Sequence, residues 1–510
     1  MARGAPAGHT AEHTRSKYAS LIRRHWVLLA VIVGSVAVRL VGIGWGLPYL
    51  YHPDEPNDLT RALTMLRESD LNPHWFHYGS LMFYLYGGLI AIVAGVRGLL
   101  GVGDGLGAIE GPQMIATASG ITADPWTLLV PRAMSVAMSV ATVVVIYFIV
   151  RRLTGRTYAA GLGAGLFALA PLAVSEGRLF TPNTLTALFT ALAIGAAFRI
   201  YERGLPRDYV IAGAMVGLAA GSKYNAGFVF IAIVTAHLLR SRQSGAIHAR
   251  GILMSIYTAL AAFLITTPFA VLDADEFLGD LGFELVHYST GHDGRDGGLL
   301  VYLSVLLVSF SLALVFIAFA YADRRLRPQV MISLVFGVGY VLFLSLFRTT
   351  FARNLLTALP AFCVVIALGA SAAVDRHPRR LLRWWIPAVS LASLAVAGAG
   401  LWVEYSNLED RTEAVEWIAQ NVPQHSLVLV EAYSPWVDPS THEVVNLGFA
   451  IDGTPRTDWD YMLVTPEGSG RFEAGSDRYA TEIAALEEIR STTCLIQEFP
   501  GVVEIRRQEC

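Results

Sequence analysis

The chain has 510 residues, of which 54% are hydrophobic and only 15% are charged, against about 25% charged residues in an average soluble protein. The formal net charge of −3 excludes a general basic surface of the kind that binds nucleic acid. Three cysteines are too few for a disulfide-stapled scaffold. The composition therefore indicates a polytopic membrane protein.

The first 24 residues are polar and basic, with Lys17 and four arginines, and no cleavage site of small residues precedes the first apolar segment. This excess of positive charge predicts that residues 1–24 lie in the cytoplasm. The apolar segment Trp26–Leu47 is close to the ~20 residues that cross a bilayer. It should deliver the residues that follow it to the outer face of the cell (plasma or inner) membrane.

The segment Tyr51–Asp58 follows directly and contains adjacent carboxylates, Asp54 and Glu55, between two prolines. Carboxylates beside a bilayer cost free energy unless they bind a cation or a substrate, or transfer a proton. Asp54 and Glu55 are therefore candidate catalytic residues. A structural alternative is open, because Pro53-Asp54-Glu55-Pro56 also suits the first turn of a helix.

Five basic clusters follow along the apolar part, and the positive-inside rule places all of them in the cytoplasm. They are Arg151–Arg156, Arg199–Arg207, Arg240–Arg250, Arg324–Arg327 and Arg376–Arg380. Two apolar runs, Leu81–Leu100 and Thr127–Val150, separate Asp54 from Arg151, and if both crossed the membrane, Arg151 and every later basic cluster would lie outside. This parity argument predicts that Leu81–Leu100 does not cross, and lies in the outer face or re-enters from it. The first external loop then covers residues 48–125, which is long enough to be a functional element.

We expect about eleven transmembrane helices within residues 25–403, which makes this part an all-α polytopic membrane domain. After Trp26–Leu47 they are Thr127–Val150, Tyr158–Ser175, Thr184–Ala197, Tyr209–Ala220, Ala226–Leu239, Ile252–Phe269, Leu300–Ala320, Val330–Phe347, Leu355–Ala373 and Trp384–Val403. An odd number places the C-terminal tail outside the cell. The segments Tyr209–Ala220 and Ala226–Leu239 are short and flank the polar break Gly221–Asn225. Irregular backbone at membrane depth is tolerated where it lines a cavity, so we expect the break to line one.

The tail, residues 404–510, is long enough for one small extracytoplasmic domain. Its pattern predicts a helix over Glu413–Asn421 and a buried strand over residues 426–430. Further short strands are expected at residues 444–445, 461–464 and 502–505, which indicates an α/β domain. Cys494 and Cys510 lie in this tail and could pair in an oxidising compartment.

The outer face on this topology gathers two kinds of polar side chain. Carboxylates and histidines suit proton transfer or metal binding, whereas arginine and lysine suit a phosphate. Together they predict a phosphorylated, membrane-borne substrate that is attacked with the help of a general base. Simpler interpretations are open for single residues: Lys223 could snorkel to the interface, Arg348 and Arg353 could contact lipid headgroups, and each histidine could be an ordinary hydrogen-bonding residue.

Several motifs, in this order and spacing, resemble the polyprenyl-phosphate-dependent glycosyltransferases of the GT-C fold, which include the protein O-mannosyltransferases and the aminoarabinose transferases of lipid A. The motifs are Asp54-Glu55, Leu128–Ser135, Ser175–Asn183, Gly221–Asn225 and Arg353–Pro360. The opening of the tail, Arg411–Pro423, resembles the start of the extracytoplasmic domain of these proteins.

The resemblance implies a GT-C membrane domain with juxtamembrane helices in the first external loop, and a lipid-linked sugar donor bound at the outer face. It also implies an acidic catalytic base in that loop, and Asp54 matches this carboxylate, with Glu55 as its neighbour. Arg132 matches a functional arginine at the outer end of the next span. The family often has an aspartate where this chain has Asn183, so a second carboxylate is missing at that position.

We therefore predict a membrane glycosyltransferase that moves a hexose or pentose from a polyprenyl-phosphate donor to an acceptor hydroxyl, with inversion. Asp54 would be the base. Donor-phosphate ligands and other substrate-binding residues complete the predicted site: Arg132, Arg178, Lys223, Tyr224 and Arg353 for the phosphate, and His52, His77, Asn183 and His292 for the substrate.

No cofactor is required by this mechanism, although a divalent metal could bind among Asp54, Glu55 and His292. The expected partners are the lipid-linked donor, membrane lipid and an acceptor that is a protein, a lipid or a cell-wall glycan, with no nucleic acid. A transporter or flippase for a lipid-linked or anionic substrate is the alternative, since broken helices and intramembrane charges occur there too. That alternative predicts inverted repeats and charges near the bilayer midplane.

Overall fold

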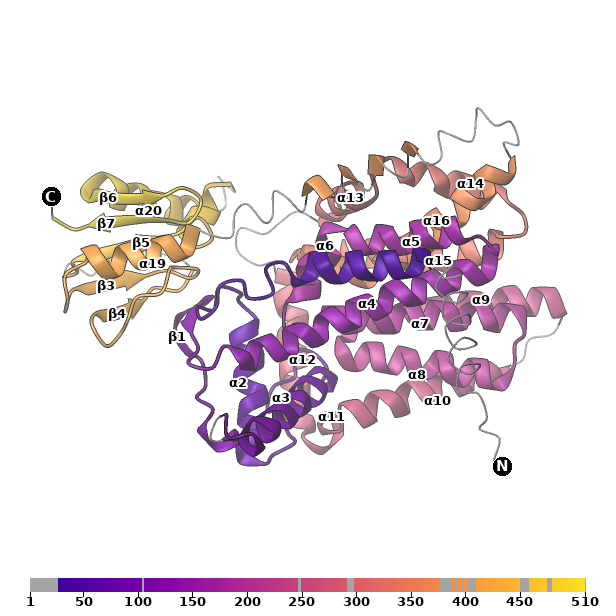
Figure 1. Cartoon of the computed structure of the whole chain (residues 1–510), viewed down its shortest axis with the longest axis horizontal. Helices are drawn as coiled ribbons and strands as arrows, with labels where there is room; N and C mark the ends of the chain where they lie inside the picture. Colours follow the sequence, from indigo (N-terminus) through magenta and orange to yellow (C-terminus); the bar gives the residue numbers. More distant parts are fainter. Residues whose placement is uncertain are drawn as a thin grey trace, which may run out of the picture.

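The computed structural model describes residues 26–102, 105–245, 249–290, 298–376, 410–449, 458–474 and 479–509, with short pieces between 388 and 400. A bundle of long helices forms most of the molecule, and a small domain with a β-sheet lies at one end of it (Figure 1). The predicted fold class, an all-α polytopic membrane protein with a small C-terminal α/β domain, is confirmed.

The bundle begins with the helix Trp26–Leu40 and continues with α4 to α10 and α13 to α16. The bounds are α4 Trp126–Thr154, α5 Thr157–Leu169, α6 Pro171–Ser175, α7 Asn183–Glu202, α8 Pro206–Ser222, α9 Phe230–Ser244, α10 Ala249–Thr266, α13 Gly298–Phe310, α14 Phe316–Ala322, α15 Arg327–Leu344 and α16 Leu359–Arg376. A continuous apolar core, with α7 and α16 the most deeply buried helices, joins them.

Eight helical segments of the described chain, one of which is Leu81–Leu99, are long and apolar enough to cross a membrane, or nine if the bent pair α5–α6 counts as one span. The protein is therefore a multi-pass membrane protein. The expected number of about eleven spans stays a prediction, because the last predicted span, Trp384–Val403, lies largely outside the described residues.

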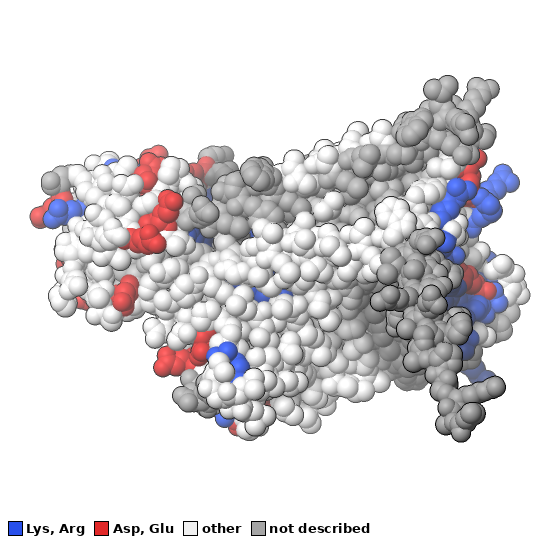
Figure 2. Space-filling model, in the orientation of Figure 1, with Lys and Arg blue, Asp and Glu red and all other residues white. Residues whose placement is uncertain are grey.

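Charged residues gather at the two ends of the molecule, and the surface between them is almost free of charge in the view of Figure 2. At the end away from the sheet domain, Arg152 pairs with Glu202 and Arg156 pairs with Asp375. Arg325 lies 3.7 Å from the same Asp375. These pairs join the ends of α4, α7 and α16, so basic clusters far apart in sequence meet at one end, as the parity argument requires.

The first external loop folds into two helices, α2 Glu55–Glu68 and α3 Leu81–Leu99, followed by a short hairpin of β1 Gln113–Ala116 and β2 Ser119–Ile121. At the start of α3, Ser80 donates its N–H to the Thr267 hydroxyl at the C-terminal end of α10. At its other end, the Arg97 guanidinium lies over the ring of Trp126, where α4 begins. Both ends of α3 thus lie at the same end of the bundle, which supports the prediction that Leu81–Leu100 does not cross.

A buried arginine stabilises the bend between α5 and α6, where the axes differ by 68°. Pro171 has no N–H, so the Phe167 carbonyl four residues earlier lacks its helical donor, and Arg39 donates to it at 3.5 Å. Arg39, which is fully buried, donates to the carbonyls of Ala168 at 2.9 Å and Ala173 at 3.1 Å. It also donates to the Ser139 hydroxyl at 2.8 Å. These hydrogen bonds hold the first helix against the bend, as an intramembrane arginine requires.

The C-terminal domain is a five-stranded mixed sheet in the order β4-β3-β5-β7-β6. Its elements are α19 Asp410–Asn421, β3 Leu427–Val430, β4 Glu443–Asn446, β5 Tyr461–Val464, α20 Ala480–Thr492, β6 Cys494–Phe499 and β7 Val503–Arg507. The strands β4, β3 and β5 are parallel, whereas β7 is antiparallel to β5 and β6. The predicted helix and four strands are present, and α20 and β6 are additional.

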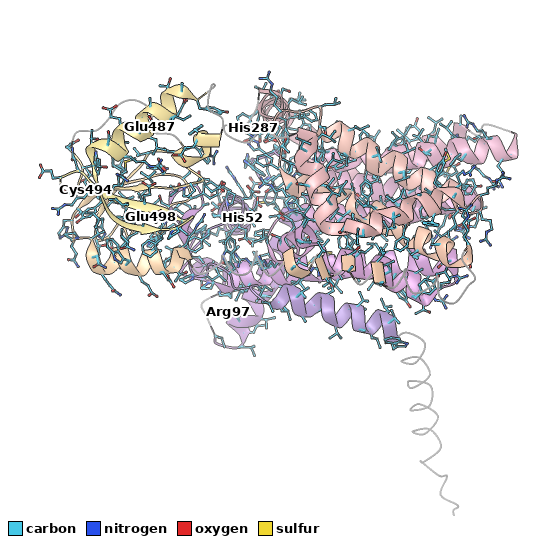
Figure 3. The ribbon with its side chains drawn as sticks, turned by 90° about the horizontal axis from the view of Figure 1, so that it is seen from above. His52, Arg97, His287, Glu487, Cys494 and Glu498 are labelled. Carbon is cyan, nitrogen blue, oxygen red and sulfur yellow. The ribbon has the colours of Figure 1, made fainter. Side chains whose placement is uncertain are left out.

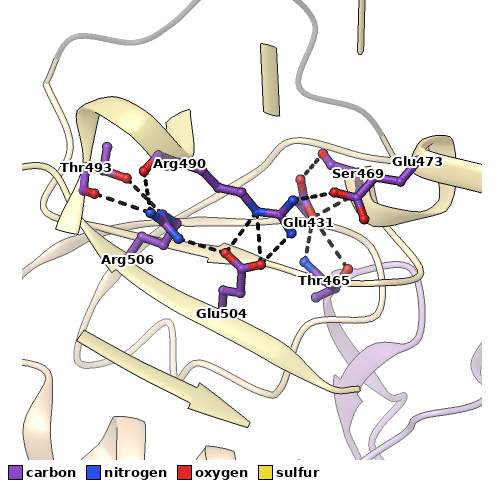
Figure 4. A network of polar contacts seen from close by, with 8 residues as sticks. All are labelled: Glu431, Thr465, Ser469, Glu473, Arg490, Thr493, Glu504 and Arg506. Carbon is purple, nitrogen blue, oxygen red and sulfur yellow. Dashed lines mark hydrogen bonds and ion pairs between the residues drawn. The ribbon is translucent and has the colours of Figure 1, made fainter. Parts of the chain in front are cut away.

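A polar network joins α20 to the antiparallel part of this sheet (Figure 4). Arg490 of α20 donates to the Glu504 carboxylate at 3.0 Å and also pairs with Glu473. Arg506 donates to the same Glu504 at 2.8 Å and to Thr493 at 2.9 Å. Two arginines thus share one carboxylate, which fixes the helix over the sheet.

The cysteines behave as their positions suggest. Cys363 is free and buried within α16. Cys494, at the start of β6, is disulfide-bonded. Cys510, the predicted partner, lies outside the described residues.

Candidate active site

A cavity of ≈ 320 Å³ lies between the first external loop, the end of the bundle and the C-terminal domain. Its volume is at the lower end of the ~300–1,000 Å³ range of small-molecule sites. Figure 3 shows His52 and His287 at this junction between the bundle and the sheet domain. The side chains that line it include Asp54, Asn57, Asp58, His77, Asn183, Lys223, Glu284, His287, Tyr288, Arg353, Tyr433 and Phe449.

Asp54 precedes the first turn of α2, but its carboxylate does not cap the helix. His52 does so instead, because its Nδ1 accepts the N–H groups of Asp54 at 3.2 Å and Glu55 at 3.4 Å. The Asp54 carboxylate therefore faces the cavity and lies 3.2 Å from the Arg353 guanidinium. His52, which the sequence suggested as a substrate ligand, is buried behind it and does not line the cavity.

The charge state of Asp54 follows from two opposing effects. Burial raises its pKa, but the positive charge of Arg353, with smaller effects of His52 and Lys223, holds the pKa below its usual range. Asp54 is therefore ionised at neutral pH, as a general base must be before it accepts a proton.

Lys223 lies in the break between α8 and the 3₁₀ turn η3 Tyr224–Val229 and lines the cavity. Its ammonium group donates to Asn354 Oδ1 at 2.7 Å and to Asn183 Oδ1 at 3.4 Å. Asn183 in turn donates its amide to the buried Glu176 at 2.7 Å, which orients the Asn183 oxygen toward the lysine. The polar break thus delivers a cation to the cavity wall, and Asn183 acts through that cation.

A second, largely apolar cavity of ≈ 250 Å³ adjoins the first and shares His77, Lys223, Glu284 and Tyr288 with it. Its other lining residues are Tyr224, Asn225, Leu281, Leu285, Phe343, Leu344 and Phe347. Tyr224 belongs to this apolar groove, and its hydroxyl donates to the Phe76 carbonyl at 2.9 Å. His77 lies between the two cavities, with its Nδ1 2.7 Å from Glu284.

A second carboxylate that the sequence analysis did not assign lines the cavity one helical turn after Asp54. Asp58 is 1% exposed, and the Tyr78 hydroxyl donates to its Oδ1. Its Oδ2 is buried without a hydrogen-bond partner among the described residues. Burial, with the negative charges of Asp54 and Glu55, raises the pKa of Asp58 well above its usual range. The i, i+4 spacing on α2 is the signal that could have identified it.

Glu55 and Arg132 form a closed pair away from the cavity. Both side chains are 1% exposed, and Arg132 donates to the two carboxylate oxygens at 2.8 and 2.6 Å. Glu55 also accepts the N–H of Phe180 at 2.8 Å, and Arg132 donates to the carbonyls of Ile43 and Trp45. Neither residue lines the cavity. We therefore give the pair a structural role, in place of the catalytic and phosphate-binding roles expected from the sequence.

Three further predictions receive no support from the site. Arg178 is buried in the turn η2 Glu176–Arg178 and does not line the cavity. His292 lies outside the described residues. In the described part of the chain, the side chains with metal-ligand geometry are His74, Asp273 and Glu276, which lie outside the cavity and include neither Asp54 nor Glu55.

Comparison with known proteins agrees with this architecture. Residues 117–271 match the family model described as dolichyl-phosphate-mannose-protein mannosyltransferase. No curated protein matches the chain by sequence. The structure of ArnT from Cupriavidus metallidurans bound to undecaprenyl phosphate is 13% identical, covers 95% of this chain and 98% of that chain, and superposes with a TM-score of 0.53.

The apo structure of the same ArnT gives a TM-score of 0.52 over the same shares of the two chains. The protein O-mannosyltransferase Pmt1–Pmt2 complex of S. cerevisiae is 19% identical over 51% of this chain and 33% of that chain, with a TM-score of 0.36. The predicted resemblance is thus confirmed: the chain is a multi-pass membrane protein with the GT-C fold of ArnT, similar to the polyprenyl-phosphate-dependent glycosyltransferases.

Proposed function

We propose that this protein is an inverting membrane glycosyltransferase that moves a sugar from polyprenyl phosphate to an acceptor hydroxyl, with Asp54 as the general base. One observation carries the proposal. A single cavity combines the ionised Asp54 carboxylate with the cations Arg353 and Lys223, and it adjoins an apolar groove. A substrate with a phosphate between a sugar and a lipid matches these three features.

The donor would bind with its lipid in the apolar groove and its phosphate at the junction of the two cavities. Tyr224, Phe343 and Phe347 would contact the first prenyl units. Lys223 and Arg353 would neutralise the phosphate, and a guanidinium can do so through two parallel hydrogen bonds. Support for this class of lipid comes from the ArnT structure, which was solved with undecaprenyl phosphate bound.

In the reaction, the acceptor oxygen attacks the anomeric carbon of the donor while Asp54 takes the hydroxyl proton. A carbon–oxygen bond to the acceptor forms, the bond from the anomeric carbon to the phosphate oxygen breaks, and polyprenyl phosphate leaves with the electron pair. Positioned bases of this kind contribute roughly 10²–10⁴-fold. Lys223 and Arg353 stabilise the charge that develops on the leaving phosphate.

The ion pair between Asp54 and Arg353 links donor binding to base strength. Before the donor binds, Arg353 holds the pKa of Asp54 low, which makes a weak base. A phosphate that shares Arg353 neutralises part of this positive charge, so the proton affinity of Asp54 rises as the donor arrives. Burial and the neighbouring carboxylates raise the pKa of Asp58, which favours its protonated form and reduces the negative charge that the incoming phosphate meets.

The orientation in the membrane follows from the charges at the two ends of the bundle. Basic residues gather at the end opposite the C-terminal domain (Figure 2). By the positive-inside rule, we propose that the N-terminus lies in the cytoplasm and that the cavity and C-terminal domain lie outside the cell membrane. The donor would reach the site through the outer half of the bilayer.

The test is a reconstitution of the full chain in lipid nanodiscs with a panel of polyprenyl-phosphate sugars, in which the release of polyprenyl phosphate is measured. We expect release from one donor, and a loss of at least 10²-fold in Asp54→Asn with donor binding retained. Asp70→Asn, in the same loop outside the cavity, is the matched control. Near-normal turnover of Asp54→Asn would contradict the assignment of the base. If the protein, reconstituted in vesicles, moves the lipid from one leaflet to the other without sugar release, the transporter alternative is favoured.

A further inference from the structure

The C-terminal domain forms one wall of the catalytic cavity. Tyr433 follows β3 and Phe449 follows β4, and both half-buried rings line the cavity. The two strands are adjacent and parallel, so the segments after them leave the same edge of the sheet. Ligands of open sheets with parallel strands bind outside this edge. We call the two side chains the aromatic wall.

The backbone at Tyr433 is held in an unusual conformation. Its φ of 65° lies in the left-handed region, which is uncommon for a residue with a bulky side chain. The Tyr433 N–H donates to the Thr117 carbonyl of the first external loop at 2.7 Å, which fixes the residue against the membrane domain. Such conformations persist where the surroundings impose them, and they cluster at functional sites.

Each ring of the aromatic wall has a guanidinium packed against it. Arg411 lies 5.6 Å from the centroid of Tyr433 and 5.1 Å from that of Tyr51 in the first external loop. Arg471 lies 4.4 Å from the centroid of Phe449. The two rings of the wall are 6.3 Å apart and inclined by 54°. These contacts fix both rings, and the surface that remains faces the cavity.

The side of the cavity with Lys223 and Tyr288 differs in chemistry from the side formed by the aromatic wall. The apolar groove continues from the face with Lys223 and Tyr288, where the donor lipid is proposed to bind. The aromatic wall is absent from that groove and belongs to the part of the cavity built by the extracytoplasmic domain and Thr117. An acceptor that approaches from outside the membrane therefore meets Tyr433 and Phe449 first.

We propose that the aromatic wall is the acceptor site, and that the acceptor is a carbohydrate whose sugar ring packs on Tyr433 and Phe449. This inference rests on the proposed function. The C–H face of a sugar ring is apolar and packs on an aromatic ring, while Asn57 and Thr117, which line the same cavity, offer hydrogen-bond partners for its hydroxyls. A cavity of ≈ 320 Å³ suits a single sugar ring better than an extended peptide.

The experiment removes the rings and compares transfer with hydrolysis. Tyr433→Asn deletes the ring, and asparagine tolerates the left-handed backbone, so the variant should fold. Phe449→Leu is the second variant. Each variant is incubated with the donor that the unmodified protein cleaves and with a panel of soluble oligosaccharides. Sugar transfer to the oligosaccharide and hydrolysis of the donor by water are both measured. We expect the ratio of transfer to hydrolysis to fall at least tenfold, with a raised KM for the acceptor.

His425→Asn is the matched control, because His425 has a φ of 66° in the same domain and does not line the cavity. It should keep the ratio of the unmodified protein. An unchanged ratio and acceptor KM in both wall variants would overturn the proposal, as would efficient transfer to a Ser/Thr peptide by the wall variants.

A binding measurement separates this proposal from the proposed function. Saturation-transfer NMR of the same oligosaccharides with the full chain needs no donor. We expect a signal for the unmodified protein and for His425→Asn, and a loss of most of it for Tyr433→Asn. If no donor is cleaved but this pattern appears, the proposed function fails while the wall remains a carbohydrate site; if the unmodified protein gives no signal for any oligosaccharide, the wall proposal fails.

Discussion

Asp54 and Glu55 are adjacent carboxylates, but their replacement by the corresponding amides should affect different properties of the protein. Glu55→Gln removes the negative charge from a fully buried ion pair, and the partner Arg132 keeps its positive charge. Asp54→Asn makes the same chemical change at a side chain that is 31% exposed. We expect the first variant to lose stability and the second to lose sugar transfer.

The magnitude follows from the geometry of the pair. Arg132 makes two charge-assisted contacts with Glu55, at 2.6 and 2.8 Å, and water does not reach either side chain. Removal of one partner from such a buried pair costs about 3–5 kcal/mol. This corresponds to roughly 10² to 5 × 10³ in the opening equilibrium. A partly exposed pair such as Asp54–Arg353 contributes about 0–1 kcal/mol.

Two measurements report this loss. Hydrogen exchange follows the Phe180 N–H, which donates to Glu55, and its protection should fall first. A thiol-reactive dye follows Cys363, which is free and buried in α16 and becomes accessible when the bundle opens. The double variant Glu55→Gln/Arg132→Met should recover much of the lost stability, because no unpaired charge remains.

The result that refutes this reasoning is specific. If Glu55→Gln keeps the protection of Phe180 and the slow labelling of Cys363 but abolishes transfer, then Glu55 takes part in the chemistry. If Asp54→Asn proves the less stable of the two, the assignment of the exposed and buried carboxylates is reversed.

Three further outcomes are expected. Arg353→Gln should move the acid limb of kcat/KM to higher pH, because the guanidinium that lowers the pKa of Asp54 is gone; a pH–rate profile in which the limb stays in place would contradict the pairing. Asp58→Asn should leave the melting temperature within a few degrees, since burial and neighbouring carboxylates raise the pKa of Asp58 and favour its neutral form, whereas Asp58→Lys should prevent folding. In the C-terminal domain, burial raises the pKa of Glu431 to about 7 from an ordinary 4.5, so the folded domain holds a proton that the unfolded chain releases. The free energy of unfolding of the C-terminal domain should therefore fall as pH rises from about 4.5 to about 7. Hydrogen exchange at β3, measured as a function of pH, detects this dependence, and Glu431→Gln should remove it.

Charge was the most reliable signal in the sequence. Basic clusters separated by more than 150 residues were expected on one side, and Arg156 and Arg325 do meet at Asp375. The same reasoning placed Leu81–Leu100 at the outer face, and both ends of α3 lie at one end of the bundle. Lys223, Arg353, Arg178 and Asp54 were likewise expected together, because the positive-inside rule assigns all four to one face; the first two line the cavity with Asp54, whereas Arg178 does not.

What the sequence could not show was the direction of individual side chains. Adjacent residues on a helix point about 100° apart, so Asp54 faces the cavity while Glu55 faces Arg132. A motif that contains both carboxylates does not reveal this division. The role of Asp58 depends equally on its burial against Tyr78, which is a long-range contact.

The buried Arg39 bears on how the protein is made. Its acceptor at Ala168 lies 129 residues further along the chain, so at about 5–20 residues per second it is synthesised roughly 6–26 s after the arginine. During this interval the first helix carries a guanidinium whose insertion into hydrocarbon costs at most about 3.5 kcal/mol on translocon scales. The helix Trp26–Leu40 should therefore stay in contact with the insertion machinery until α5 and α6 have been synthesised. The first helix and the bent pair α5–α6 would then insert into the membrane together.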